Sequence, residues 1–305
     1  MISAVDDKLF GQLLRRIDPA LRLLRAWPLA GGVSAQVMGI EYITADGCTG
    51  RLVVRRHGDA DRARNPRIAA DEYALLQRLH AAGLAVPAPR HLDESGELFP
   101  DPVLVIEHVE GTSDFAATPG QIAQLAAQLA AIHGLDVARL DVAFLPRQAE
   151  IVARQLRARP ASTHLQTVEG RVWDLLERAW PVVQRNPPAL LHGDYWPGNM
   201  LWRDGRLAAV IDWEDAAVGD PLADVANCRL ELLWAGGAEA AELFTRHYCS
   251  LAPLDTAELP YWELCAALRP LRNMSSWGLD AEAERAMRAA LEMCVLQALA
   301  RLGAE

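Results

Sequence analysis

The amino-acid sequence predicts an α+β fold in two lobes, a small β-rich N-terminal lobe over residues 1–109 and a larger, mainly helical C-terminal lobe over residues 110–305. Three observations carry this prediction. Short apolar runs separated by glycine turns fill residues 28–56, which is typical of β-strands. Beyond Gly111 the apolar residues recur at helical spacing, and one β-rich stretch over residues 189–215 interrupts them. A chain of 305 residues is long enough for two lobes.

The N-terminal lobe is expected to begin with an amphipathic helix over residues 5–26, because apolar residues from Leu9 to Ile17 share one helical face. The β-rich part follows, with turns at Gly31-Gly32 and Asp46-Gly47. A helix and two further strands are expected over residues 65–83, 86–92 and 101–111.

In the C-terminal lobe, Asp204-Gly205 joins two short apolar runs and is typical of a β-hairpin turn. The lobe should therefore hold a loop over residues 190–202, one hairpin, and a segment over residues 207–214 that follows the turn. Helices are expected on both sides, over residues 118–134, 143–158, 167–185, 221–235, 238–250, 257–271 and 281–302.

The composition narrows the classes of partner. The net charge is −10 and the pI about 5.3, which argues against a nucleic-acid partner and suits a cationic small molecule. The five cysteines occur singly, so the sequence indicates neither a zinc site nor a disulfide framework. No signal-peptide core and no long apolar run is present, so we expect a cytoplasmic protein with no membrane partner. Nothing in the sequence indicates an oligomeric state.

Polar residues gather at the two outer ends of the predicted hairpin. Asp194 and Asn199 precede its first strand, and Asp212 and Glu214 follow its second. Because a hairpin brings its outer ends together, these side chains should converge. Oxygen ligands suit Mg²⁺, and a nearby carboxylate can take a proton from a hydroxyl. Each residue alone is better explained as a polar turn or core residue, but the joint pattern favours a reaction centre.

The segments "HGDYWPGNMLW" and "AAVIDWEDAAVGDPLADVA" resemble the aminoglycoside phosphotransferase and choline kinase-like family, which has the protein-kinase-like fold. Weaker likenesses cover most of the chain in the right order, including "LAGGVSAQVMGIEY", "RLVVRR", "ADEYALLQRL" and "PVLVIEHVEGT". The resemblance implies that Asp194 is the catalytic base and that His192 braces its loop. It also implies that Asn199 and Asp212 hold Mg²⁺ against the phosphates of ATP, while Glu214 contacts metal or substrate.

Two further aspartates lie in "GDPLADVA". Asp220 can cap a helix that begins at Pro221. In the family that the segment resembles, these aspartates brace the catalytic loop, so Asp220 and Asp224 are expected to support the site from behind.

Three parts of the N-terminal lobe are expected to bind the nucleotide. Glycine residues let backbone N–H groups approach phosphates, although a plain hairpin turn explains them equally well without the resemblance. The family normally has a cation on its third strand, often lysine, but the single lysine here, Lys8, precedes the first strand. We expect Arg55 rather than Arg56 to be the cation on the third strand, and Glu72 to be its ion-pair partner. The hinge would contact adenine through its backbone, which does not distinguish ATP from GTP. The residues expected at these places are Gly31, Gly32, Ser34, Arg55, Glu72, Glu107 and Val109.

These observations predict an ATP- and Mg²⁺-dependent phosphotransferase that acts on a hydroxyl of a small molecule, such as an aminoglycoside, an amino alcohol or a sugar. Two alternatives remain open. One is a kinase-like nucleotide-binding or interaction module without small-molecule kinase activity, and the other is a metal-dependent hydrolase. Tryptophans and acids of the C-terminal lobe could line the acceptor site or belong to the core; they are Trp213, Trp262, Trp277, Glu263, Asp280 and Glu282.

Overall fold

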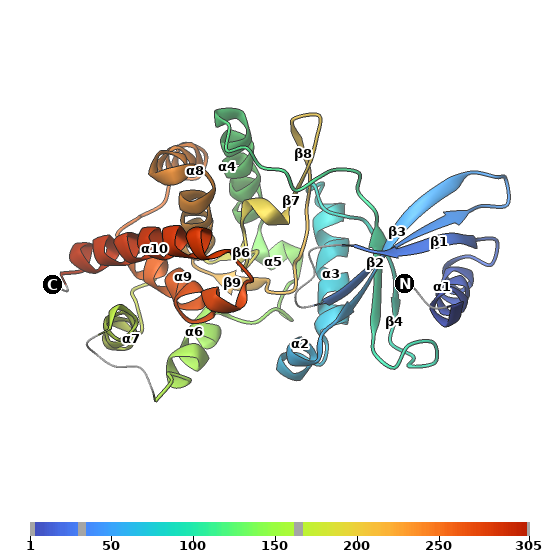
Figure 1. Ribbon diagram of the computed structural model, residues 1–305, viewed down its shortest axis with the longest axis horizontal. Coiled ribbons are helices and arrows are strands. Elements are labelled where there is room, and N and C mark those ends of the chain that lie inside the picture. The colour runs from blue at the N-terminus through green and yellow to red at the C-terminus, as the bar shows by residue number, and fades with distance from the viewer. Residues whose placement is uncertain (1–3, 30–34, 162–166, 304–305) are drawn as a thin grey trace. The chain divides into compact units, whose positions relative to one another are not determined.

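The computed structural model describes residues 4–29, 35–161 and 167–303 of the chain. The chain divides into two compact units, which are shown as ribbons in Figure 1. The first unit contains Met1–Gly111 and Ala208–Glu214, and the second contains Thr112–Leu207 and Asp215–Glu305. The segment after the hairpin turn, which the sequence analysis placed in the C-terminal lobe, therefore belongs largely to the first unit.

The first unit is built on a five-stranded sheet with the order β1-β2-β3-β5-β4, in which all neighbours are antiparallel. Its helices are α1 (Ala4–Ile17), α2 (Asp59–Arg64) and α3 (Ile68–Ala81). Its strands are β1 (Arg22–Pro28), β2 (Ala35–Ile43), β3 (Thr49–His57), β4 (Pro89–Asp93) and β5 (Val103–Glu107).

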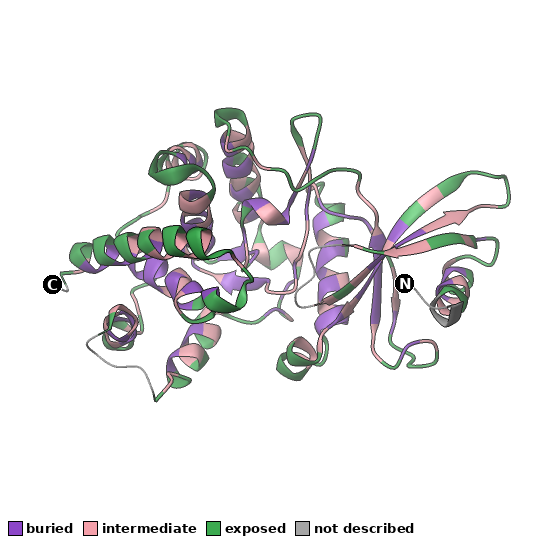
Figure 2. Cartoon of the chain, in the orientation of Figure 1, coloured by how far each residue is buried: buried purple, intermediate pink, exposed green. Residues whose placement is uncertain are grey.

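The two faces of this sheet have different roles. On β3, Leu52 and Val54 join the apolar core that also contains Phe10 and Leu13 of α1. Strand alternation turns Arg55 to the opposite face, where its side chain contacts helix α3. Figure 2 shows how strongly β3, β5 and α3 are buried. A charged residue in this position must be paired with opposite charge.

The helix predicted over residues 5–26 is wrong in its second half. Helix α1 ends at Ile17, and residues from Arg22 onward form β1. Pro19 explains the difference, because proline disfavours helical backbone at the residue before it and cannot donate a helical hydrogen bond. The carboxylate of Asp18 instead accepts the backbone N–H of Ala20 at 2.8 Å, which forms a turn into the strand.

The second unit is mainly helical. Its helices are α4 (Pro119–His133), α5 (Val137–Leu140), α6 (Gln148–Arg157), α7 (Val168–Ala179), α8 (Leu222–Leu251), α9 (Leu259–Asn273) and α10 (Ala281–Arg301). Two short strands, β6 (Ala189–Leu191) and β9 (Ala217–Gly219), pair antiparallel. The predicted hairpin is present as β7 (Met200–Arg203) and β8 (Arg206–Val210), and the boundary between the units falls within β8.

Helix α8 is the element on which most of the site in the second unit rests. It begins after Pro221 and contains one residue with non-helical backbone, Gly237, at which two helices meet in a kink. The sequence analysis predicted these as separate helices over residues 221–235 and 238–250. Among the helices of the described ranges, none is both long and apolar enough to cross a membrane.

Candidate active site

The loop that carries Asp194 begins where β6 ends and closes with a turn of 3-10 helix over Pro197–Asn199. Gly193 has a φ of +85°, and a Cβ added there would lie 2.0 Å from the backbone oxygen of Asp215. Any side chain at this position would force the loop away from residue 215. Glycine is therefore required by both the backbone conformation and the close approach.

Asp224, at the start of α8, holds this loop by its backbone. Its carboxylate accepts the N–H groups of His192 at 2.7 Å and Gly193 at 3.0 Å, and it lies 3.2 Å from Nε2 of His133. Burial raises the pKa of Asp224, but the hydrogen bond from His133 and its charge outweigh burial and hold the pKa below its usual value. A fixed negative charge thus sits behind the loop.

Asp220 supports the Asp194 loop indirectly, through the start of helix α8. Its carboxylate accepts the N–H of Leu222 at 3.0 Å and the side-chain amide of Asn186 at 3.2 Å, so it caps the start of α8. Burial raises the pKa of Asp220. Capping at Asp220 fixes the position of Asp224 one turn further along the helix.

His192 and Tyr195 pack on the inner side of the loop. The His192 ring is fully buried, and its Nδ1 accepts the backbone N–H of Asp194 at 3.3 Å. Tyr195 is also fully buried, and its hydroxyl donates to the backbone oxygen of Leu125 at 2.8 Å. These contacts hold the backbone at Asp194.

Asp194 and Asn199 face each other across the loop. Nδ2 of Asn199 donates to the backbone oxygen of Asp194 at 2.9 Å and lies 3.4 Å from its carboxylate. This leaves the amide oxygen of Asn199 as the atom that could bind a cation. The Asp194 side chain is 20% exposed and forms an ion pair of 3.1 Å with Arg269 of α9. Asp194 is therefore held in place while part of its carboxylate reaches solvent.

In the first unit, Arg55 joins three carboxylates. Its Nη1 lies 3.0 Å from Glu72, and its Nη2 bonds both Asp212 and Glu214, the latter at 2.6 Å. The contact expected between Arg55 and Glu72 is thus present. Arg56 points the other way and lies over the Phe99 ring. We call Arg55, His57, Glu72, Asp212 and Glu214 the Arg55 cluster.

Apart from Asp212, whose side chain is 33% exposed, the Arg55 cluster is largely buried, and it is rich in negative charge. His57 contacts Glu72 at 2.7 Å, so one arginine and one histidine face three carboxylates. Burial raises the pKa of Glu72, but the charge of Arg55 and the hydrogen bond from His57 outweigh it and hold the pKa below its usual value. The carboxylates raise the pKa of Arg55 against the opposing effect of burial.

The backbone of Asp212 has an unusual conformation. It is a non-glycine residue with a φ of +68°, a conformation that costs energy for an L-residue and persists where the surroundings impose it. Here the bond to Arg55 holds its side chain. Such residues are concentrated at functional sites, in agreement with a role for Asp212 beyond the core.

The expected metal ligands fit Mg²⁺ by their chemistry. Asp212 offers a carboxylate and Asn199 an amide oxygen, and Mg²⁺ prefers such oxygen ligands and keeps several waters or phosphate oxygens. Within the described residues, no group of three or more His, Cys, Asp or Glu side chains has the arrangement of a metal site.

The structure describes four of the seven residues that are expected to bind the nucleotide, namely Arg55, Glu72, Glu107 and Val109. Gly31, Gly32 and Ser34 lie outside the described residues. The backbone N–H of Glu107 donates to the oxygen of Ala88 at 2.8 Å, so this N–H is already used within the sheet. Among the described backbone hydrogen bonds, none involves the N–H of Val109. The adenine contact expected at this hinge would therefore depend on Val109 for its donor.

The acceptor candidates among aromatic and acidic residues mostly have structural roles. Trp213 and Trp262 are buried, Glu263 pairs with Arg229 and Arg301, and Asp280 caps α10. Two residues that the sequence analysis did not identify do lie near Asp194. They are Arg269, its ion-pair partner, and Glu231 of α8, on which the Asp194 charge acts. No motif marks either residue, because their positions depend on how α8 and α9 pack.

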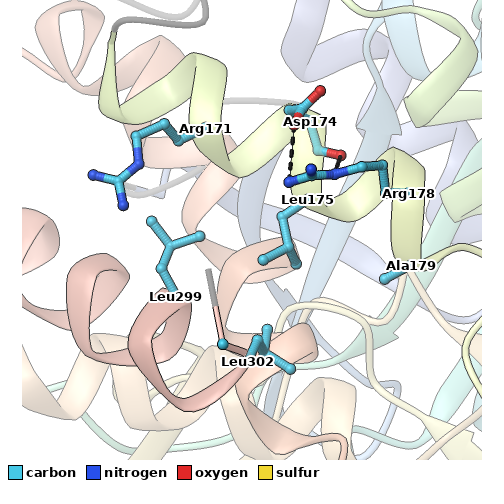
Figure 3. A pocket seen from close by; sticks show the side chains of 8 residues that line it. Arg171, Asp174, Leu175, Arg178, Ala179, Leu299 and Leu302 are labelled. Carbon is cyan, nitrogen blue, oxygen red and sulfur yellow. Dashed lines mark hydrogen bonds and ion pairs between the residues drawn. The ribbon is translucent and has the colours of Figure 1, made fainter. Parts of the chain in front are cut away.

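A pocket of about 610 Å³ lies elsewhere in the second unit, between α7 and the end of α10. Figure 3 shows Arg171 and the Asp174–Arg178 ion pair of 2.9 Å on its α7 side, with Leu299 and Leu302 opposite. None of the predicted site residues lines it.

The model of a family described as "Phosphotransferase enzyme family" matches residues 28–263. A homoserine kinase of Methylocella silvestris is 28% identical over 223 residues, which cover 67% of this chain and 68% of that protein. Acyl-CoA dehydrogenase family member 11 of Rattus norvegicus is 29% identical over 186 residues, which are 53% of this chain but 23% of that protein. This chain thus corresponds to only part of the second relative.

Solved structures agree on the fold. The macrolide 2'-phosphotransferase of Brachybacterium faecium has a TM-score of 0.64 at 21% identity, covering 92% of this chain and 97% of that one. An amicoumacin kinase in complex with AMP-PNP and Ca²⁺ has a TM-score of 0.66 at 16% identity, covering 97% of this chain and 96% of that one. These likenesses confirm the predicted α+β, protein-kinase-like fold.

Proposed function

This chain belongs to the phosphotransferase enzyme family, and from that membership we propose that it transfers the γ-phosphoryl group of ATP to a hydroxyl of a small molecule, with Mg²⁺ as cofactor. A general small-molecule kinase activity follows from the family. The observation that carries the finer proposal is the Asp194 loop, which Asp224 and His192 hold rigidly while the Asp194 carboxylate stays partly accessible.

In the proposed reaction the acceptor hydroxyl lies against Asp194. Its oxygen attacks the γ-phosphorus as the bond to the β,γ-bridging oxygen breaks, and ADP leaves with that oxygen. The hydroxyl proton passes to the Asp194 carboxylate, which acts as general base. Asn199 keeps this carboxylate oriented through its Nδ2, and the ion pair with Arg269 keeps it in place.

The phosphates of ATP are assigned to the Arg55 cluster and to Mg²⁺. Asp212 and Asn199 would hold the ion, with Glu214 as a further carboxylate beside it, and bound Mg²⁺ would neutralise charge on the phosphate oxygens. Arg55 would contact phosphate through its guanidinium while Glu72 orients it. An arginine can hold a carboxylate and a phosphate at once with separate N–H groups, which a lysine does less well.

The proposed class of acceptor is based on one relative and on the net charge of the chain. The homoserine kinase relative suggests a hydroxyl on a small amine, and the net charge of −10 favours a cationic acceptor over a neutral one. The macrolide and amicoumacin kinases share the fold only and do not choose among acceptors.

A screen for ATP consumption tests the proposal. Purified protein is incubated with Mg·ATP and, separately, homoserine, amino alcohols, aminoglycosides, macrolides and neutral sugars, and the products are identified by mass spectrometry. We expect ADP and a phosphorylated acceptor in equal amounts with at least one amine. ADP with inorganic phosphate alone would indicate a hydrolase, and nucleotide binding without turnover of any acceptor would indicate a kinase-like binding module.

A further inference from the structure

Helices α8, α9 and α10 (Figure 1) line another pocket of the second unit, with a volume of about 460 Å³. Its α8 residues come from both sides of the kink at Gly237. Successive residues of a helix are turned by about 100°, so Arg229 and Leu233 lie about 140° and 180° around α8 from Asp224. This part of the pocket wall is therefore on the side of α8 away from the carboxylate that holds the Asp194 loop.

Most of the residues that line this pocket are apolar. They include Leu230 and Leu233 of α8, and Ala290 and Met293 of α10. The Met293 side chain is 58% exposed, so the apolar wall reaches the surface of the protein. Pockets of several hundred Å³ with a mainly apolar wall and a few polar groups are typical binding sites for small molecules.

The charged residues of the lining carry an excess of positive charge. Glu263 of α9 is buried, with a side chain that is 4% exposed, and it pairs with Arg229 at 2.9 Å and with Arg301. Two guanidinium groups thus share one carboxylate. Glu242 also lines the pocket, but it is exposed and pairs with Arg246 at 3.8 Å. One positive charge beside the pocket therefore has no carboxylate of its own.

Both arginines keep N–H groups that a ligand could use. Nε of Arg229 donates to Glu263, while its Nη1 donates to Thr245 and to the backbone oxygen of Ala241. Its Nη2 has no hydrogen bond within the described residues and is not sealed from solvent. Arg301 donates to Glu263 through Nη2, and its side chain is 48% exposed. Guanidinium N–H groups of this kind match the oxygens of a carboxylate.

We propose that this pocket binds an amphipathic carboxylate, an anion that carries a hydrocarbon chain of about eight carbons. The carboxylate accepts N–H groups of Arg229 and Arg301 and balances the charge that Glu263 leaves over. The chain lies against Leu233 and Met293, where burial of its apolar surface is favourable. An amine of the same length would meet the arginines with like charge. The assignment does not depend on the proposed reaction.

A series of ligands tests the chain and the charge separately. Butanoate, hexanoate and octanoate are titrated into the full-length chain by calorimetry, with octan-1-ol and octylammonium as ligands of matched length. We expect one octanoate per chain and a Kd that falls about 15-fold for each two CH₂ groups added. Octan-1-ol should bind more weakly than octanoate, and octylammonium more weakly still. Equal binding of octanoate and octan-1-ol, or an affinity that does not depend on chain length, would overturn the proposal.

Variants test where the ligand binds. Arg301→Gln should weaken octanoate about tenfold or more, since a charged hydrogen bond is lost, and leave octan-1-ol unchanged. Ala290→Phe fills the pocket and should abolish binding of octanoate. Ala289→Phe is its matched control, because Ala289 is the exposed neighbour on α10 and does not line this pocket. Thermal melts check that each variant is folded. Octanoate binding that survives Arg301→Gln unchanged, or that both phenylalanine variants affect equally, would contradict the assignment.

A thiol of the lining locates the ligand in the wild type, without any variant. Cys294 lines the pocket, and burial raises its pKa to about 11, whereas Cys48 is exposed and lies in the first unit. Saturating octanoate should slow the alkylation of Cys294 by iodoacetamide, measured by peptide mass spectrometry, and leave the rate at Cys48 unchanged. Octanoate that binds without protecting Cys294 would place its site elsewhere and overturn the proposal.

Discussion

At the scale of single residues, the Arg55 cluster concentrates most of the buried charge of the first unit. Glu72 is 3% exposed and accepts contacts from both Arg55 and His57. Loss of the Glu72 charge would take one of three carboxylates from Arg55 and the nearer of two from His57, and breaking a buried ion pair is far more costly than breaking a surface pair. The Arg55 cluster should therefore stabilise the fold whether or not the proposed reaction takes place.

We predict that Glu72→Gln lowers the free energy of unfolding by about 3 kcal/mol at pH 7. The pKa of Glu72 is lowered in the fold, so its contribution is complete above the unfolded pKa near 4.5 and is lost as the pH falls through the lower folded value. The deficit of the variant should therefore shrink in acid. Urea unfolding at pH 7 and below pH 4 measures both effects.

Glu97→Gln is the control for this substitution. Glu97 also pairs with an arginine, Arg16 at 2.5 Å, but its side chain is 71% exposed. Its loss should cost about 1 kcal/mol or less, because an exposed ion pair contributes little. If Glu72→Gln cost no more than Glu97→Gln at pH 7, the cluster would not stabilise the fold in the way described.

The contacts of single residues differ in how far the sequence could predict them. Strand alternation meant that only one of Arg55 and Arg56 could face the nucleotide, and the end of the apolar run together with the resemblance favoured Arg55, whose ion pair with Glu72 is present. Arg269 and Glu231 were missed. Their relation to Asp194 arises from the packing of α8 against α9, which no local pattern encodes.

At the scale of elements, α8 supports the Asp194 loop and carries a kink at Gly237, where φ is +77° and ψ is −178°. This backbone conformation is essentially restricted to glycine. A Cβ added at Gly237 would meet nothing within 4 Å, so space is not the obstacle. A substitution there would test the backbone conformation alone.

We predict that Gly237→Ala destabilises the protein by about 1–3 kcal/mol, the cost of a side chain in this region of φ and ψ. Gly120→Ala is a matched comparison. Gly120 lies in the first turn of α4 with ordinary φ and an equally open Cβ position, so alanine should stabilise by about 0.5–1 kcal/mol. Thermal melts of the two variants should shift in opposite directions; a shift in the same direction would contradict the strained kink.

The same scale explains the error in the first helix. Leu9 and Leu13 have helical spacing, and a helix is found there. The prediction continued it to residue 26 because periodicity was given more weight than Pro19, after which the chain forms β1. The helices of the second unit were placed with smaller errors, since their apolar faces are long and bounded by caps such as Thr118 and Asp280.

At the scale of the whole molecule, the order of the lobes could be predicted from the sequence, and the solved relatives confirm the fold. The assignment of Ala208–Glu214 to the first unit could not. That segment follows the hairpin in the chain, but Val210 donates to the backbone of Ala85, and Asp212 and Glu214 bind Arg55. Contacts between residues far apart in the sequence decide to which unit a segment belongs, and no local sequence pattern predicts them.

The whole account depends on Asp194 as the group that receives the acceptor proton. The most direct test is the kcat of Asp194→Asn with an acceptor identified in the screen, at saturating Mg·ATP and with Mg·ATP binding checked by thermal shift. We predict that kcat falls by about 10²–10⁴, the usual contribution of a general base, while nucleotide binding is retained. A kcat within about tenfold of the wild type would contradict the assignment.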